Sequence, residues 1–170
     1  MSDEKLLGTT PKVTRILMSE EAIYGLILVS GMIVVSYNLT GTSLSALVTV
    51  VVTVLVFFCA HVYAGTLSRL AATDGKAGLP ESIRGAVHHS LGMLLISLAP
   101  VAVLLLGVTR VVDDDRAVWF ALFIDSLALG ILGWVAVAKW TKHFWLRLAS
   151  ALLTAAFGGV LIFLKAFIHH

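Results

Sequence analysis

Charge is scarce in this sequence: 13% of its 170 residues are Asp, Glu, Lys or Arg, against about 25% in typical soluble domains. Hydrophobic residues make up 59% of the chain. A soluble protein with so few charges could not cover its surface with polar groups, whereas long apolar runs suit a lipid solvent. The composition therefore predicts an integral membrane protein, and no polar stretch is long enough to build a separate soluble domain.

Cysteine is nearly absent as well. The single Cys59 excludes an internal disulfide and a Cys-rich metal or iron–sulfur site, and we expect it to be a small apolar filler in a helix. The net charge is only +2 and no stripe of Lys and Arg exists, which argues against nucleic acid as a partner. No nucleophile–base pair or phosphate-binding loop is visible, so we do not expect an enzyme.

Five apolar runs are long enough to cross a bilayer, which takes roughly 20 residues in a helix. A lone strand cannot satisfy its backbone in lipid, so each run is expected to be helical. The predicted fold is an all-α, polytopic membrane helix bundle with five transmembrane helices in one domain, 21–168, after an N-terminal arm, 1–20. The expected spans are about 21–39, 42–64, 88–109, 117–140 and 144–168.

Local signals fill in the segments around these spans. Asp74-Gly75 predicts a turn in the middle loop, and Pro80 is suited to opening a short surface helix before the third span. Pro100 predicts a kink inside the third span. The acidic run Asp113–Asp115 is expected to cap the fourth span.

Lys and Arg in short loops set the orientation of a membrane protein. With the N-terminus inside, nine of these residues lie inside and three outside, which predicts an N-in, C-out protein of the plasma membrane. The arm lacks the apolar segment of a cleavable signal peptide. The terminal pair His169-His170 is set aside, because it is either native or the remnant of a tag.

Ionisable residues in or at the membrane are costly and therefore mark candidate sites. Glu21, His61, His88 and His89 are all expected near the cytoplasmic ends of the first three spans, with Tyr24 one turn from Glu21. If they converge, they could bind a divalent transition metal or carry a proton. The alternative is a set of interfacial residues whose polar ends reach water.

A second candidate pair lies in the last two spans. Asp125 and Lys165 are expected to meet, because the fourth and fifth spans run antiparallel and a lysine stem is long. A structural ion pair is the first interpretation, and a cation or proton station at Asp125 is the alternative.

The fifth span carries two ladders of small residues at a spacing of four. Small residues let helix backbones approach closely. The first ladder predicts either a homo-oligomer interface or packing inside one subunit. The two ladders are Ser150, Thr154, Gly158 and Ala151, Ala155, Gly159.

Several short motifs resemble a family of small actinobacterial membrane proteins. In the first span, 21–30 (EAIYGLILVS) is similar to an E-x-A-I-Y-G-x-x-L-V-S stretch, and 60–64 (AHVYA) to an A-H-x-Y-A motif. His88-His89 stands where the family pairs His with Glu, and 164–169 (LKAFIH) is similar to its closing motif. The resemblance implies a five-helix bundle and supplies no activity. Gly158-Gly159 in the last span is also faintly similar to vacuolar-iron-transporter-type proteins, whose glutamate-rich cytoplasmic helices this chain lacks.

Three classes of function are compatible with these residues. A small cation, metal or proton transporter or channel would use the Glu/His group, with Asp125 as a second site. A non-enzymatic accessory or scaffold protein would need only packing surfaces. A haem protein would need His61 and His88 or His89 as axial ligands close to the membrane surface.

Overall fold

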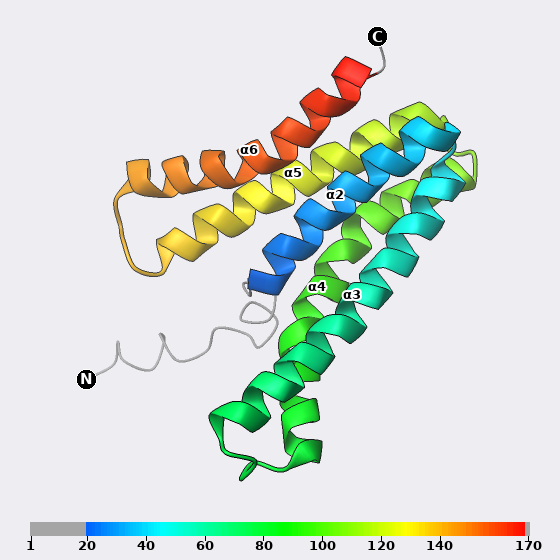
Figure 1. The fold of residues 1–170 in the computed structure, drawn as a ribbon. Coiled ribbons are helices and arrows are strands. Elements are labelled where there is room, and N and C mark those ends of the chain that lie inside the picture. Colours follow the sequence, from blue (N-terminus) through cyan, green and yellow to red (C-terminus); the bar gives the residue numbers. More distant parts are fainter. Residues whose placement is uncertain (1–19, 169–170) are drawn as a thin grey trace.

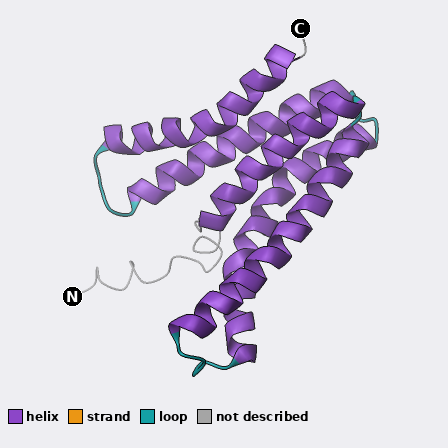
Figure 2. Cartoon of the chain, in the orientation of Figure 1, coloured by secondary structure: helices purple, strands orange, loops and turns teal. Residues whose placement is uncertain are grey.

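A computed structural model of the protein describes residues 20–168, and the N-terminal arm and the His169-His170 pair lie outside them. The described part consists of five helices joined by short loops, and no strand occurs in it (Figure 2). The helices are α2 (Glu20–Thr40), α3 (Ser43–Ala72), α4 (Leu79–Val108), α5 (Asp114–Ala138) and α6 (Phe144–Ile168). All five are long and apolar enough to cross a membrane, which confirms the predicted all-α bundle with five candidate spans.

Each helix turns back beside its predecessor, so the bundle has two ends. The Glu21 end holds the start of α2, the α3–α4 turn and the α5–α6 loop. The Asp114 end holds the α2–α3 turn, the α4–α5 loop and the end of α6 (Figure 1).

The α3–α4 hairpin is longer than the sequence predicts. At 30 residues each, α3 and α4 measure about 45 Å, well beyond a hydrocarbon core of about 30 Å. Gly65 lets the two helices continue side by side, since a Cβ there would lie 3.2 Å from Cβ of Ala86. The separate surface helix expected at Pro80 is therefore wrong: Pro80 opens α4 itself, and the hairpin projects past the Glu21 end of α2 (Figure 1).

The first helix, which is the most polar of the five, is the central one. α2 contacts each of the other four helices and lies between α5 and the α3–α4 pair (Figure 1). Its polar side chains Ser30, Ser36 and Tyr37 are buried. Hydroxyl groups on α2 can therefore meet partners on several neighbours, and Ser36 lies 3.1 Å from the hydroxyls of both Ser45 and Thr49 on α3.

Two apolar clusters fill the centre of the bundle. The larger one lies towards the Asp114 end and joins α2, α3, α4 and α5 around Val29, Ile33, Leu104 and Leu122. The smaller one lies towards the Glu21 end and joins Ala22 and Leu26 of α2 to Leu129 and Leu132 of α5. One stretch of α2 and α5 lies between the two clusters, and it is the position of the candidate site.

The first small-residue ladder of α6 packs against α5 of the same chain. Ser150 donates to the carbonyl of Gly133 at 2.9 Å, and a Cβ on Gly158 would lie 2.8 Å from Cα of Ser126. Thr154 lies against Gly133 from the same face. Close backbone approach explains the small residues without a second subunit, so an oligomer of this chain would need other surfaces.

Candidate functional site

Asp125 is a carboxylate at the middle of the membrane-spanning region. It lies 11 residues after the first residue of α5, which places it about 16 Å along the helix and near the centre of a core about 30 Å thick. Ser30 occupies the matching position halfway along α2. The Ser30 hydroxyl donates to Oδ2 of Asp125 in a buried hydrogen bond between the two helices.

The second oxygen of this carboxylate, Oδ1, is buried and has no hydrogen-bond partner among the described residues. The Asp125 side chain is 0% exposed. Along α2 and α5, Leu26 and Leu129 lie on one side of the Ser30–Asp125 pair, and Ile33 and Leu122 lie on the other. The carboxylate is therefore enclosed by apolar side chains towards both ends, in a medium where an unpaired polar oxygen is expensive.

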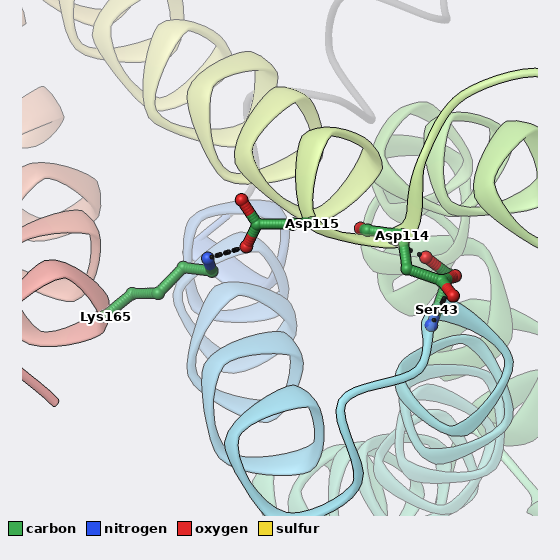
Figure 3. Close-up of polar contacts among 4 residues, drawn as sticks. All are labelled: Ser43, Asp114, Asp115 and Lys165. Atoms are coloured by element: carbon green, nitrogen blue, oxygen red, sulfur yellow. Dashed lines mark hydrogen bonds and ion pairs between the residues drawn. The ribbon is translucent and has the colours of Figure 1, made fainter. Parts of the chain in front are cut away.

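Lys165 does not pair with Asp125, and the predicted ion pair between them is wrong. Its Nζ lies 2.8 Å from Oδ1 of Asp115, in the first turn of α5 (Figure 3). The same ammonium group lies 4.3 Å from the centre of the Trp119 ring and 5.0 Å from that of Tyr37. One carboxylate and two aromatic faces thus compensate a lysine whose side chain is 0% exposed. Lys165 lies too near the Asp114 end to reach a group three turns further along α5.

The acidic residues at the start of α5 bind neighbouring helices and do not cap α5 through the Asp113 side chain. Asp113 stands at the N-cap position, but its side chain makes no capping hydrogen bond. Oδ1 of Asp114 instead accepts from the backbone N–H of Ser43 at 2.9 Å, at the first residue of α3 (Figure 3). The Ser43 hydroxyl donates to the backbone carbonyl of Asp114. Asp114 thereby joins α5 to the start of α3, while Asp115 holds α6.

The predicted Glu/His group comes together only in part. Nε2 of His89 lies 2.8 Å from Oε1 of Glu21, and the Glu21 side chain is largely buried. Nδ1 of His61 instead contacts the carbonyl of Phe57 on its own helix at 2.9 Å, and His88 is exposed. Tyr24, at 60% exposure, points away from the bundle.

The converging metal site of Glu21, His61, His88 and His89 is therefore wrong. Within residues 20–168, no group of three or more His, Cys, Asp or Glu side chains is placed to hold a metal ion. Of the three histidines, only His89 contacts Glu21, while His61 bonds within α3. What remains is a carboxylate–imidazole pair, in which the second Glu21 oxygen is buried without a hydrogen-bond partner among the described residues.

Comparison with known proteins adds no identification: no protein-family model matches the chain, and no curated protein or solved structure does so either. The resemblance to small actinobacterial membrane proteins and to vacuolar-iron-transporter-type proteins remains a prediction. The fold defines the class, a multi-pass bundle of apolar helices.

Proposed function

We propose that this protein is a small cation transporter or channel in which Asp125 is the cation-binding group, with a proton or a small metal cation as cargo. The observation that carries the proposal is the fully buried carboxylate at mid-membrane depth, with one oxygen bonded to Ser30 and the other without a partner among the described residues. Ionisable groups at this depth are costly and typically line ion or proton pathways.

The surroundings of Asp125 support an occluded binding site. Apolar side chains separate it from both ends of the bundle, as required for a site that opens to one side at a time. The Glu21–His89 pair lies at the Glu21 end, in the first turn of α2, where this carboxylate and imidazole could receive or release the cation. We place this end in the cytoplasm of a plasma-membrane protein, because the α3–α4 and α5–α6 connections carry most of the loop Lys and Arg.

Flux through reconstituted protein tests the proposal. Purified protein would be placed in vesicles containing a pH-sensitive or metal-sensitive dye, and gradients of H⁺, Na⁺, K⁺ and Mn²⁺ applied in turn. We expect flux of at least one cation with the unmodified protein, at least a tenfold loss with Asp125→Asn, and unchanged flux with Asp113→Asn. Asp113 is a suitable control because it is exposed and lies outside the helix core.

Two outcomes would overturn the proposal: no flux above empty vesicles for any of the four cations, or equal flux in Asp125→Asn and the unmodified protein. Infrared difference spectra between high and low pH give an independent measurement. A carboxylic acid band that disappears only in Asp125→Asn would show that this group exchanges a proton, as a proton carrier requires.

An accessory or scaffold role is the second candidate. It is favoured by the large exposed apolar surface of α6. In the most apolar 18-residue stretch of α6, 11% of the residues are buried, whereas the share in α2 is 50%. In that role the Ser30–Asp125 hydrogen bond would serve only to fix α2 against α5. Absence of flux, together with a membrane partner that co-purifies in a fixed ratio, would support this role.

A further inference from the structure

A groove of about 440 Å³ lies between α5 and α6, on the outside of the bundle where Phe123 and Leu152 are exposed. Small residues form its floor, with Gly130 on α5 opposite Ala151 and Ala155 on α6. Phe123, Ile131 and Trp134 form its walls. Its single polar residue, Ser126, already donates its hydroxyl to the carbonyl of Ala155. The groove therefore offers shape and apolar surface, with almost no hydrogen-bonding capacity.

The dimensions of the groove match one lipid tail. Along α5 it extends from Phe123 to Trp134, which is 11 residues or about 16 Å, roughly half of a 30 Å hydrocarbon core. It starts near the middle of the helix and ends one to two turns before the α5–α6 loop. It thus lies within one leaflet, and its occupant would run from the bilayer centre to the interface at the Glu21 end.

The interface at that end of the groove is cationic. Lys139 and Lys142 are exposed in and beside the α5–α6 loop. The guanidinium of Arg147 donates to the carbonyls of Thr141 and Ala138 and so fixes the shape of this loop. The sequence contains no Asp or Glu after Asp125, so no carboxylate from α6 or this loop offsets the positive charge. Basic residues at an interface attract anionic lipid headgroups.

We propose that the α5–α6 groove holds one acyl chain of an anionic glycerophospholipid, with the phosphate at Lys139 and Lys142. Trp134 closes the loop end of the groove, where its ring packs edge-to-face on Phe144 at 5.4 Å between centroids. The acyl chain fills the apolar groove, and the two lysines give the preference for an anionic headgroup. The proposal is independent of cation transport, because none of these residues contacts Asp125 or Ser30 through a hydrogen bond.

Quenching of Trp134 by brominated lipid tails tests this assignment. The full chain carrying Trp119→Phe, Trp140→Phe and Trp145→Phe retains Trp134 as its only tryptophan. It would be placed in vesicles of phosphatidylcholine and phosphatidylglycerol, with bromine on the tails of one lipid at a time. We expect the brominated phosphatidylglycerol to quench Trp134 at least threefold more strongly at equal mole fraction.

Two further variants separate the headgroup from the groove. Lys139→Gln with Lys142→Gln should remove the preference for phosphatidylglycerol but leave quenching by both lipids. Ala151→Phe fills the floor and should reduce quenching, whereas Ala156→Phe, the same change on an exposed position of α6, should not. Helix content by circular dichroism identifies any variant that has failed to fold.

If the two lipids quench Trp134 equally in the protein that retains both lysines, the proposed preference for an anionic lipid is wrong. Equal quenching in Ala151→Phe and Ala156→Phe would overturn the groove as its site. Weak quenching by both lipids would show that another helix, such as one from a second copy of the chain, covers Trp134, and would also overturn the proposal.

Discussion

The ammonium group of Lys165, near the end of α6, lies 2.8 Å from Oδ1 of Asp115, at the start of α5. The two partners are unequally placed, because the side chain of Lys165 is 0% exposed and that of Asp115 is 47% exposed. Loss of the carboxylate would strand a buried cation, whereas loss of the ammonium would leave an anion that water can reach. The pair should therefore respond asymmetrically to substitution.

We expect Asp115→Asn to destabilise the protein by roughly 3 kcal/mol and Lys165→Met by about 1 kcal/mol, since removing one partner of a buried pair costs most when the remaining charge is buried. Thermal unfolding of the purified protein in detergent measures the difference. The double variant should be more stable than Asp115→Asn alone. Asp113→Asn is the control, because its 3.5 Å pair with Arg116 is exposed on both sides. An Asp115→Asn variant no less stable than this control would contradict the asymmetry.

Adjacent glycines on α6 should respond oppositely to the same substitution. A Cβ on Gly158 would lie 2.8 Å from Cα of Ser126, a backbone atom that cannot move without shifting α5, whereas Gly159 has nothing within 4 Å. We expect Gly158→Ala to cost about 1–3 kcal/mol from overpacking. Gly159→Ala should be neutral or stabilise by up to about 1 kcal/mol, because alanine favours the helix. Equal melting temperatures for the two variants would show that α6 does not pack on α5 as described.

The Ser30–Asp125 pair should be a site where stability and function conflict. Ser30→Ala removes the donor to Oδ2 and so leaves both carboxylate oxygens without a hydrogen-bond partner among the described residues. We expect this variant to be less stable by about 1–3 kcal/mol, the cost of a buried unsatisfied group. Replacing both members, as in Ser30→Ala with Asp125→Leu, removes the polar groups together and should recover or exceed the original stability. Unfolding and vesicle flux would be measured on the same samples.

A double variant that is more stable but has no flux would mean that the carboxylate is kept for function at the expense of stability. If the double variant is instead less stable than Ser30→Ala alone, Asp125 contributes to packing in ways that the hydrogen bond does not explain.

The sequence was sufficient to predict the five helices, because runs such as 44–60 leave a membrane chain few alternatives to a helix. Helix ends were less predictable. The end of an apolar run predicts where a helix leaves the lipid, which is not where the helix itself ends. α3 and α4 continue past the ends of their apolar runs because they remain in contact at Gly65 and Ala86.

Side-chain pairing could not be predicted, since it depends on how each helix is rotated towards its neighbours. Asp125 and Lys165 are both buried, but their partners Ser30 and Asp115 lie 95 and 50 residues away in the sequence. The acidic run that contains Asp115 predicts a helix cap, and nothing in the sequence marks Tyr37 and Trp119 as partners of a cation. The one available clue was the polarity of the first span, which predicts a helix that other helices surround.

Orientation can be measured with single cysteines in the loops. In a Cys59→Ala background, Lys76→Cys in the α3–α4 turn and Lys142→Cys in the α5–α6 loop should react with a membrane-impermeant maleimide only after cells are permeabilised. Asp113→Cys in the α4–α5 loop should react in intact cells, because α4 and α5 each cross the membrane once between these positions. The reverse pattern would put the lysine-rich end outside, and with it the groove and the Glu21–His89 pair. The same accessibility at positions 76 and 113 would mean that α4 does not span the membrane, and the mid-membrane depth assigned to Asp125 would then no longer hold.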